Sequence, residues 1–201
     1  MKHNALKWTV IALTPAALLV FTSCSSTPEG EGATVVAAEK GVPGGIMVET
    51  YQTTATVTGI DAAKRKVTLV SPDGKKNTYK AAPEVINFDQ IRIGDQLKIT
   101  ATEQLVVYVA GEGETPSDGG AQLVALAPKG AKPGALMAET TQVTAKVTAI
   151  DSEHHKATLQ FEDGTTRTVA VRQDVDLSQR KVGDSVVIRT TGSLAIQVTK
   201  P

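Results

Sequence analysis

The chain has 201 residues, with 21 lysines and arginines balanced by 21 aspartates and glutamates, and 3% of its residues are aromatic. A neutral chain with so few aromatic side chains argues against a nucleic-acid-binding surface, which needs a basic face and rings on which bases stack. The single cysteine has no disulfide partner within the chain.

Residues 1–23 have the three-part form of a bacterial signal peptide. Lys2 and Lys7 give a positive start, and an apolar run from Trp8 to Phe21 follows. The run is shorter than the about 20 residues of a transmembrane helix and matches the apolar core of a signal peptide. We predict that residues 1–23 are removed. Cleavage takes away two lysines and no acidic residue, so the net charge changes from 0 to −2.

Cys24 stands at the predicted cleavage point. The sequence Phe-Thr-Ser-Cys resembles the lipobox of bacterial lipoproteins, in which the cysteine carries the lipid, including palmitate, and becomes the first residue. Phe21 and Ser23 depart from that family's commonest residues, which are leucine, and glycine or alanine. The resemblance implies a membrane anchor at Cys24. Because Ser25 rather than aspartate follows the cysteine, it also implies an outer-membrane location facing the periplasm and not the cytoplasm. The alternative is an ordinary secretory signal with a stray cysteine.

The mature chain contains a duplication. Pro43–Gly74 aligns without gaps on Pro133–Gly164, with 17 identities in 32 positions. Looser similarity continues to the end of each copy. We place the copies at residues 44–110 and 133–201, after a tether at residues 24–43. Between them lies a flexible linker at residues 111–132, in which Gln122–Ala127 could add an edge strand.

Each copy predicts five short strands. The first alternates apolar residues with threonine or lysine, which is typical of a strand with one buried face. An Asp-Gly pair then predicts a hairpin between the second and third strands. A Gly-Asp pair opens the fourth strand. The expected strands of copy one centre on Ala55–Gly59, Val67–Val70, Tyr79–Ala81, Leu97–Ile99 and Leu105–Val109; those of copy two centre on Val143–Ala149, Ala157–Phe161, Val169–Val171, Val186–Ile188 and Leu194–Val198.

Five strands in about 65 residues, with a break after the third, fit a small closed barrel that leaves no exposed edge. We therefore predict an all-β fold of two tandem five-stranded OB-like barrels joined by a flexible linker. The order of turn and core residues resembles small extracytoplasmic OB-type barrels of bacteria, including secreted domains and, more distantly, periplasmic copper/silver metallochaperones. This resemblance supports the fold rather than a function.

The metallochaperone resemblance implies a copper site of one histidine, two methionines close in sequence and a tryptophan. The mature chain has no tryptophan, and Met47 and Met137 lie one in each copy. It therefore lacks the ligands for soft-metal chemistry, and we predict no cofactor.

His154 and His155 lie in the link between the first two strands of copy two. Copy one has Lys64 and Arg65 at this point, so we interpret the pair as a solvated turn. The alternative is a metal site formed by both histidines with Glu153, although a closed zinc site needs four fixed ligands.

The repeated Met-x-Glu-Thr motif places Glu49 and Glu139 at equivalent positions before the first strands. We consider them candidate contacts for a ligand or partner, together with Tyr51 and Tyr79, whose rings could stack on a sugar. The alternative is that the methionines pack on the core while the glutamates face solvent.

The sequence has no nucleophile elbow, no metal-ligand histidine spacing and no phosphate-binding glycine loop, so we predict that the protein is not an enzyme. We expect a lipid-anchored cell-envelope protein whose two modules bind another envelope protein, a peptide or a glycan. The alternatives are a periplasmic metal-handling lipoprotein and a structural envelope spacer.

Overall fold

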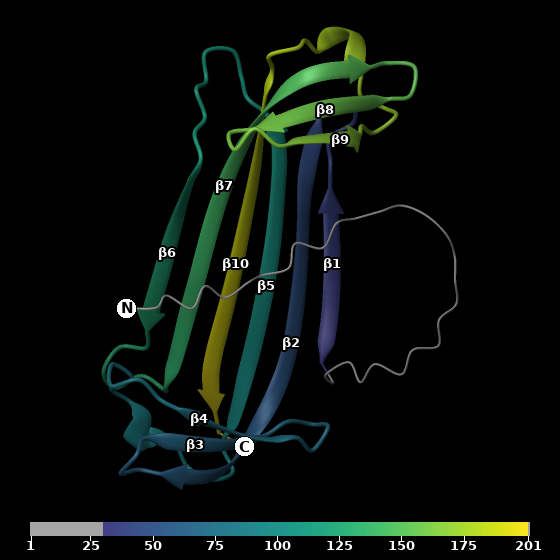
Figure 1. The fold of residues 1–201 in the computed structure, drawn as a ribbon. Helices are drawn as coiled ribbons and strands as arrows, with labels where there is room; N and C mark the ends of the chain where they lie inside the picture. Colours follow the sequence, from purple (N-terminus) through teal and green to yellow (C-terminus); the bar gives the residue numbers. More distant parts are fainter. Residues whose placement is uncertain (1–29, 201) are drawn as a thin grey trace.

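The computed structural model describes residues 30–200, and this part of the chain is all-β, as predicted (Figure 1). Its ten strands form one antiparallel sheet, and none of these residues forms a helix long and apolar enough to cross a membrane. The leader and Cys24 lie outside the described residues. The strands are β1 (Glu31–Ala37), β2 (Gly44–Asp61), β3 (Lys66–Val70), β4 (Lys76–Lys80), β5 (Gln96–Val109), β6 (Gly119–Leu126), β7 (Gly134–Asp151), β8 (Lys156–Phe161), β9 (Thr166–Ala170) and β10 (Ser185–Thr199), with 3₁₀ turns at Phe88–Gln90 and Leu177–Gln179.

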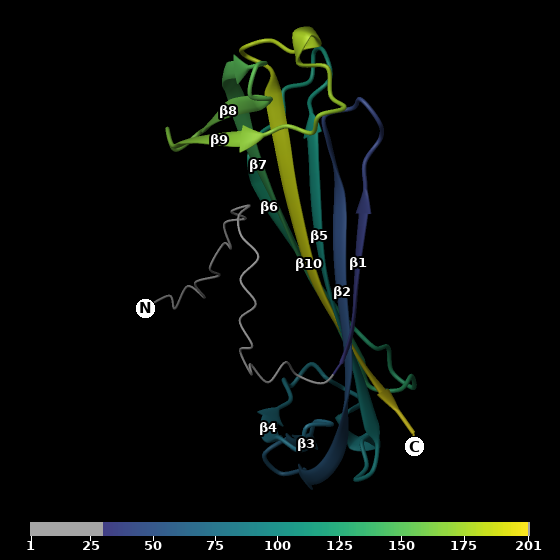
Figure 2. The same ribbon diagram turned by 90° about the vertical axis from the view of Figure 1, so that its right-hand side faces the viewer.

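Six strands lie side by side in the order β1-β2-β5-β10-β7-β6 and form a central sheet. The β3–β4 hairpin continues from the end of β2, and the β8–β9 hairpin continues from the end of β7. Seen from its side, the central sheet is a single layer, and both hairpins project from the same face at opposite ends (Figure 2).

The prediction of two separate closed barrels is wrong, because the sheet is continuous from one copy to the other and does not close. The expected fourth and fifth strands of each copy are one strand, β5 with 14 residues and β10 with 15. These strands are much longer than the usual 5–6 residues. In copy one the residues between Ile99 and Leu105 include no proline or glycine that would turn the chain.

Two small cores lie at the ends of the central sheet, under the hairpins. We call the end that contains β3 and β4 lobe 1 and the end that contains β8 and β9 lobe 2. The core of lobe 1 consists of Ala55, Val57, Val67, Leu69, Phe88, Ile91 and Val198. The core of lobe 2 consists of Ala145, Val147, Leu159 and Val186, with the partly buried Val107, Val109, Ile150, Phe161 and Ile188 packed against it.

Each lobe therefore uses a strand of the other copy. Val198 belongs to β10 of copy two but is buried in lobe 1, where it is 5% exposed. Val107 and Val109 belong to β5 of copy one but pack against lobe 2. Neither copy contains all the apolar side chains of its own core.

The two copies are related by an internal two-fold axis. In the β5–β10 pair, Glu103 faces Gly192, which is its equivalent in the repeat, so the axis passes between these two residues. A two-fold axis perpendicular to the sheet places both lobes on the same face, as Figure 2 shows.

A β-bulge bends each of the longest strands into its lobe. The pairing of β2 with β3 shifts register between Val57 and Gly59, and the pairing of β7 with β8 shifts between Val147 and Ala149. A bulge increases the local twist of a strand and bends it. Each of these strands therefore starts in the central sheet and ends in a hairpin that leaves it.

The expected tether and linker both contain strands. Residues 31–37 of the tether form β1, which pairs with β2. Residues 119–126 of the linker form β6, which pairs with β7 and includes most of the expected edge strand at Gln122–Ala127. The two strands share the pattern Gly-Ala-x-x-Val-Ala, at Gly32–Ala37 and Gly120–Ala125. The duplicated unit is therefore longer than residues 44–110 and 133–201.

Candidate functional site: the inner face of the central sheet

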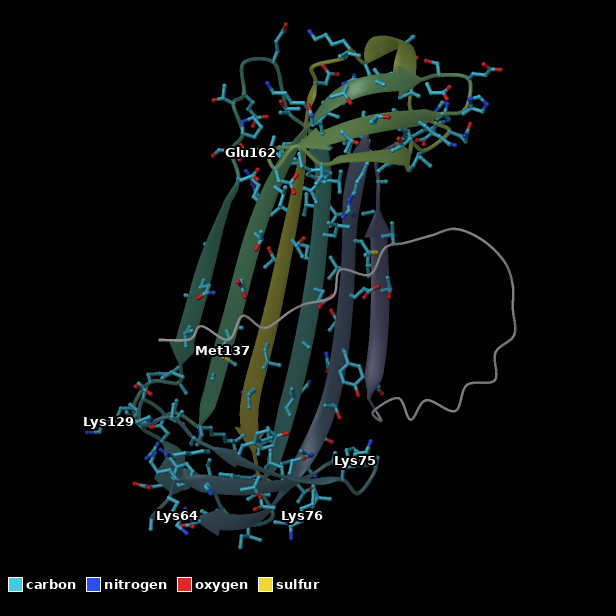
Figure 3. All side chains as sticks on the ribbon, in the orientation of Figure 1. Lys64, Lys75, Lys76, Lys129, Met137 and Glu162 are labelled. Carbon is cyan, nitrogen blue, oxygen red and sulfur yellow. The ribbon has the colours of Figure 1, made fainter. Side chains whose placement is uncertain are left out.

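Alternate residues of the central strands point toward the side on which the lobes lie. Ala55 and Val57 of β2 are buried in lobe 1, so Met47, Glu49 and Tyr51 of the same strand share their side of the sheet. Directly paired residues on neighbouring strands point to the same side of the sheet, so the register shows which residues of every other central strand lie on this side. We call the side between the two lobes the inner face. Figure 3 looks onto it, with Met137 of β7 labelled.

A row of carboxylates crosses the middle of the inner face. Glu49 of β2 pairs with Glu103 of β5, which pairs with Gly192 of β10, which in turn pairs with Glu139 of β7. All three glutamates are exposed. Thr34 on β1 and Gln122 on β6 complete the row at the edges of the sheet. We call Glu49, Glu103 and Glu139 the carboxylate row.

Apolar side chains lie on both sides of the carboxylate row. One neighbouring row contains Val36, Met47 and Leu105. The other runs through Tyr51, Ala101, Leu194, Met137 and Val124. Val36 is 71% exposed and Val124 is 67% exposed. Among residues 30–200 no second layer covers these side chains, because every other strand and turn belongs to the central sheet or to the lobes.

Among residues 30–200, the charged side chains of the inner face are all carboxylates. Register places Lys98, Lys146 and Arg189 on the opposite side of the sheet, and none of the described lysines or arginines forms a salt bridge with the carboxylate row. Glu49 and Glu103 face each other directly, which is a destabilising arrangement for like charges. Gln122 Nε2 donates to Glu139 Oε1 at 3.3 Å.

The structure brings three of the four predicted contact residues together. Glu49, Glu139 and Tyr51 lie on the inner face, where the Tyr51 ring lies so close to Gly30 that a Cβ there would overlap it. Tyr79 lies elsewhere, on β4 of lobe 1, and is 57% exposed.

Sequence reasoning missed Glu103. Its repeat equivalent is Gly192, so comparing the copies gave no repeated carboxylate at this position. The signal that could have found it is the unbroken strand through residues 96–109, which places Glu103 on the same side as Leu97 and Leu105.

The histidines of the predicted turn have separate partners. His154 Nδ1 lies 2.8 Å from Asp151 Oδ2, and the His154 backbone N–H donates to Asp151 Oδ1 at 2.9 Å. These two contacts hold the pKa of Asp151 below its ordinary value. His155 Nε2 instead lies 3.1 Å from the carbonyl oxygen of Val175. Glu153 is exposed, and residues 30–200 contain no cluster of three or more histidine, cysteine or acidic side chains suited to a metal ion.

The second position of this turn anchors a loop in both copies. Arg65, the equivalent of His155, donates through Nη2 to the carbonyl oxygens of Ala82 and Val85, at 3.0 and 2.8 Å. Its guanidinium carbon also lies 4.8 Å from the centre of the Phe88 ring. Val85 and Val175 are equivalent residues of the repeat. In both copies the second residue of the turn therefore contacts the carbonyl oxygen of the equivalent valine. The predicted solvated turn does not include such a contact.

Contacts between the copies also hold the two hairpins that carry the edge strands. Arg172 of lobe 2 donates to the carbonyl oxygens of Glu39 and Val42 in the β1–β2 turn, at 2.8 and 3.0 Å. Asp174 accepts from Arg172 and from the Gly41 N–H, and both contacts hold the pKa of its carboxyl far below the ordinary range.

At the opposite end, Asn87 Nδ2 donates to the carbonyl oxygen of Pro128 in the β6–β7 turn at 2.9 Å. Each edge hairpin is thus fixed by hydrogen bonds to the lobe of the other copy.

Comparison with protein-family models gave no match, and no curated protein is significantly similar to this chain. The geometry is therefore the basis on which a function can be argued. A solvent-open face with apolar rows on both sides of three carboxylates is suited to non-covalent contact.

Proposed function

We propose that the protein is a lipid-anchored envelope protein that binds a partner non-covalently through the inner face of its central sheet. The observation that carries this proposal is the open inner face, with Val36, Met137 and Val124 exposed on it. Contiguous exposed apolar patches on soluble proteins commonly mark interaction sites. The lobes project from the same side, so they bound the surface at two ends.

The proposed anchor is the lipid on Cys24. Six residues lie between Cys24 and Glu31, the first residue of β1. Such a segment spans at most about 3.3–3.6 Å per residue, so an anchored protein would stay within a few tens of ångströms of the membrane. The partner in this proposal is a component of the same envelope.

Site-specific photocrosslinking in cells tests the surface. A photoreactive residue at Leu105, on the inner face, should capture a partner. The same residue at Gln104, its neighbour on the opposite side of β5, should capture markedly less. Equal capture at both positions, or none at Leu105, would contradict the proposal.

Labelling with an alkyne analogue of palmitate tests the anchor. The wild-type chain should incorporate the label and sediment with membranes, whereas Cys24→Ala should do neither. A Cys24→Ala variant that keeps both properties would show that the lipid is not attached at this residue.

A further inference from the structure

We infer that the partner of the inner face is a cationic amphipathic peptide segment that lies across the central strands. In this arrangement lysine or arginine side chains contact the carboxylate row, and apolar side chains contact the rows beside it. The inference rests on the proposed function and adds the chemical class of the partner.

Charge complementarity indicates that the partner carries positive charge. In the part of the chain that the structure describes, the strands place three exposed carboxylates and no cationic side chain on the inner face, while Lys98, Lys146 and Arg189 lie on the other side. An anionic partner would meet like charge along the whole width of the face. A neutral apolar partner would bury the three carboxylates without compensation.

The spacing of the row fits a peptide that crosses the strands. Neighbouring strands lie about 4.8 Å apart, which puts Glu49 about 5 Å from Glu103 and Glu139 about 10 Å farther on. Residues i and i+4 of an α-helix lie about 6 Å apart, and residues i and i+7 about 10.5 Å apart along its axis. The apolar rows lie two residues away along the strands, or about 7 Å. A helix about 10–12 Å wide extends about 5–6 Å to each side of its axis, and the side chains of the two rows cover the remaining distance.

The row is unfavourable in the free protein. Glu49 and Glu103 face each other on adjacent strands, and none of the described cations pairs with them. Like charges at directly opposite positions destabilise a sheet. Binding of a cationic segment removes this repulsion. Replacing the carboxylates should therefore weaken binding while leaving stability equal or higher, and a purely structural role predicts the opposite change in stability.

Gly192 offers a gain-of-function test. It occupies the place in the row between Glu103 and Glu139, and a Cβ added there meets nothing within 4 Å. Gly192→Glu would add a fourth carboxylate at an open position. Gly192→Gln is the matched control because it adds nearly the same side chain without the charge.

The experiment uses the full mature chain with Cys24→Ser. The probe is a fluorescent 18-residue helical peptide of leucine and lysine, and a leucine and glutamate peptide of the same pattern serves as its opposite. Fluorescence anisotropy at low and high salt gives the affinities. Glu49→Gln with Glu103→Gln and Glu139→Gln should weaken binding of the lysine peptide at least tenfold. Gly192→Glu should tighten it severalfold, and Gly192→Gln should not.

The control for overall charge is Glu84→Gln with Glu153→Gln and Glu162→Gln, which removes the same charge from the lobes; Glu162 lies well away from Met137 in Figure 3. This control should bind as the wild-type protein does. The inference is overturned if both peptides bind alike, if the control weakens binding as much as the row variant, or if Gly192→Glu has no effect. If the cationic-peptide inference fails but Leu105 still crosslinks a partner in cells, the proposed binding function stands. If that crosslinking fails as well, both the inference and the proposed function are wrong.

Discussion

Arg65 and His155 occupy the same backbone position in the two copies, with positive φ values of 51° and 54°. This left-handed conformation is uncommon for residues other than glycine, although histidine adopts it more often than arginine does. In both copies the side chain reaches a loop carbonyl. The half-buried Arg65 makes two such hydrogen bonds and stacks on Phe88.

We expect Arg65→Ala to lower the free energy of unfolding by about 1–3 kcal/mol, because it leaves two loop carbonyls without this donor. Lys64→Ala, one residue earlier and exposed, should change the free energy of unfolding by less than about 0.5 kcal/mol. Urea denaturation followed by circular dichroism measures both. Equal effects of the two substitutions would contradict an anchoring role for Arg65.

Asp95 makes the folding stability of the protein depend on pH in the acidic range. Its carboxyl is 3% exposed and lies 3.0 Å from Lys200 Nζ, while its Oδ2 accepts from the Arg92 N–H at 2.9 Å. Burial alone would raise the pKa of Asp95, but the hydrogen bonds from Arg92 and Lys200 outweigh burial and hold the pKa below its ordinary value. The contribution of Asp95 to stability is therefore present above pH 4 and is lost as the pH falls through the pKa of the folded state.

We expect Asp95→Asn to lower the thermal unfolding midpoint at pH 7 and to flatten its decline below about pH 4. Lys200→Met should have a smaller effect, since Lys200 is 55% exposed and the Arg92 N–H still bonds to Asp95. Thermal unfolding between pH 2 and 7 measures both variants. An unchanged slope of the midpoint against pH in Asp95→Asn would contradict this assignment.

At the scale of elements, the edges of the sheet are apolar. β6 contains no charged residue, and β1 contains only Glu31. Val35 of β1 is 61% exposed and Leu123 of β6 is 54% exposed, both on the side away from the lobes. Edge strands without charges or prolines are open to pairing with another chain.

We expect the mature chain with Cys24→Ser to self-associate at high concentration through these edges, and the same chain with Val35→Lys and Leu123→Lys to do so less. Sedimentation velocity over a range of concentrations measures the difference. Thr102→Lys, on the same side of β5 and paired with β2 and β10 on both sides, is the control and should associate as the wild-type protein does. No difference between the edge variant and this control would contradict pairing through the edges.

The strands of the two lobes and the ends of β5 and β10 could be predicted from the sequence, but β1 and the way in which the strands join could not. Alternation identified both halves of β5, around Leu97 and around Leu105, because each half buries one side. Alternation does not show whether two strands are separated by a turn or continue as one. The answer here depends on pairing with β10 of the other copy, which is a contact between residues about 90 positions apart.

The candidate site was predictable in part for the same reason. The repeat identified Glu49 and Glu139, and alternation could place each on one side of its strand. Only the sheet order puts them in one row with Glu103, because β2 and β7 are separated by β5 and β10. The sequence alone does not separate Tyr79 from these residues, because its strand, β4, is placed in the hairpin of lobe 1 by pairing with β3.

At the scale of the whole molecule, the shared cores make the two copies interdependent. Lobe 1 needs Val198 from copy two, and lobe 2 needs Val107 and Val109 from copy one. Burying one valine contributes about 1.5–3 kcal/mol, which is a large fraction of the stability of a small domain.

We therefore expect that residues 30–110, expressed alone, do not form a folded monomer. They should either remain unfolded or pair with a second copy through β5, and mixing with residues 111–201 should give a 1:1 complex. Light scattering after size-exclusion chromatography distinguishes these species. A folded, monomeric first half would show that the strand from the other copy is dispensable.

The axis between Glu103 and Gly192 also bears on how this protein could have arisen. In a dimer of identical half-length chains, any residue at this position would face its own copy, so a glutamate there would have met a glutamate. Joining the halves in one gene removed that constraint, and each side of the axis could then change alone. The inner face now has Glu103 on one side of the axis and Gly192 on the other. A bound peptide would therefore prefer one of its two possible orientations across the strands.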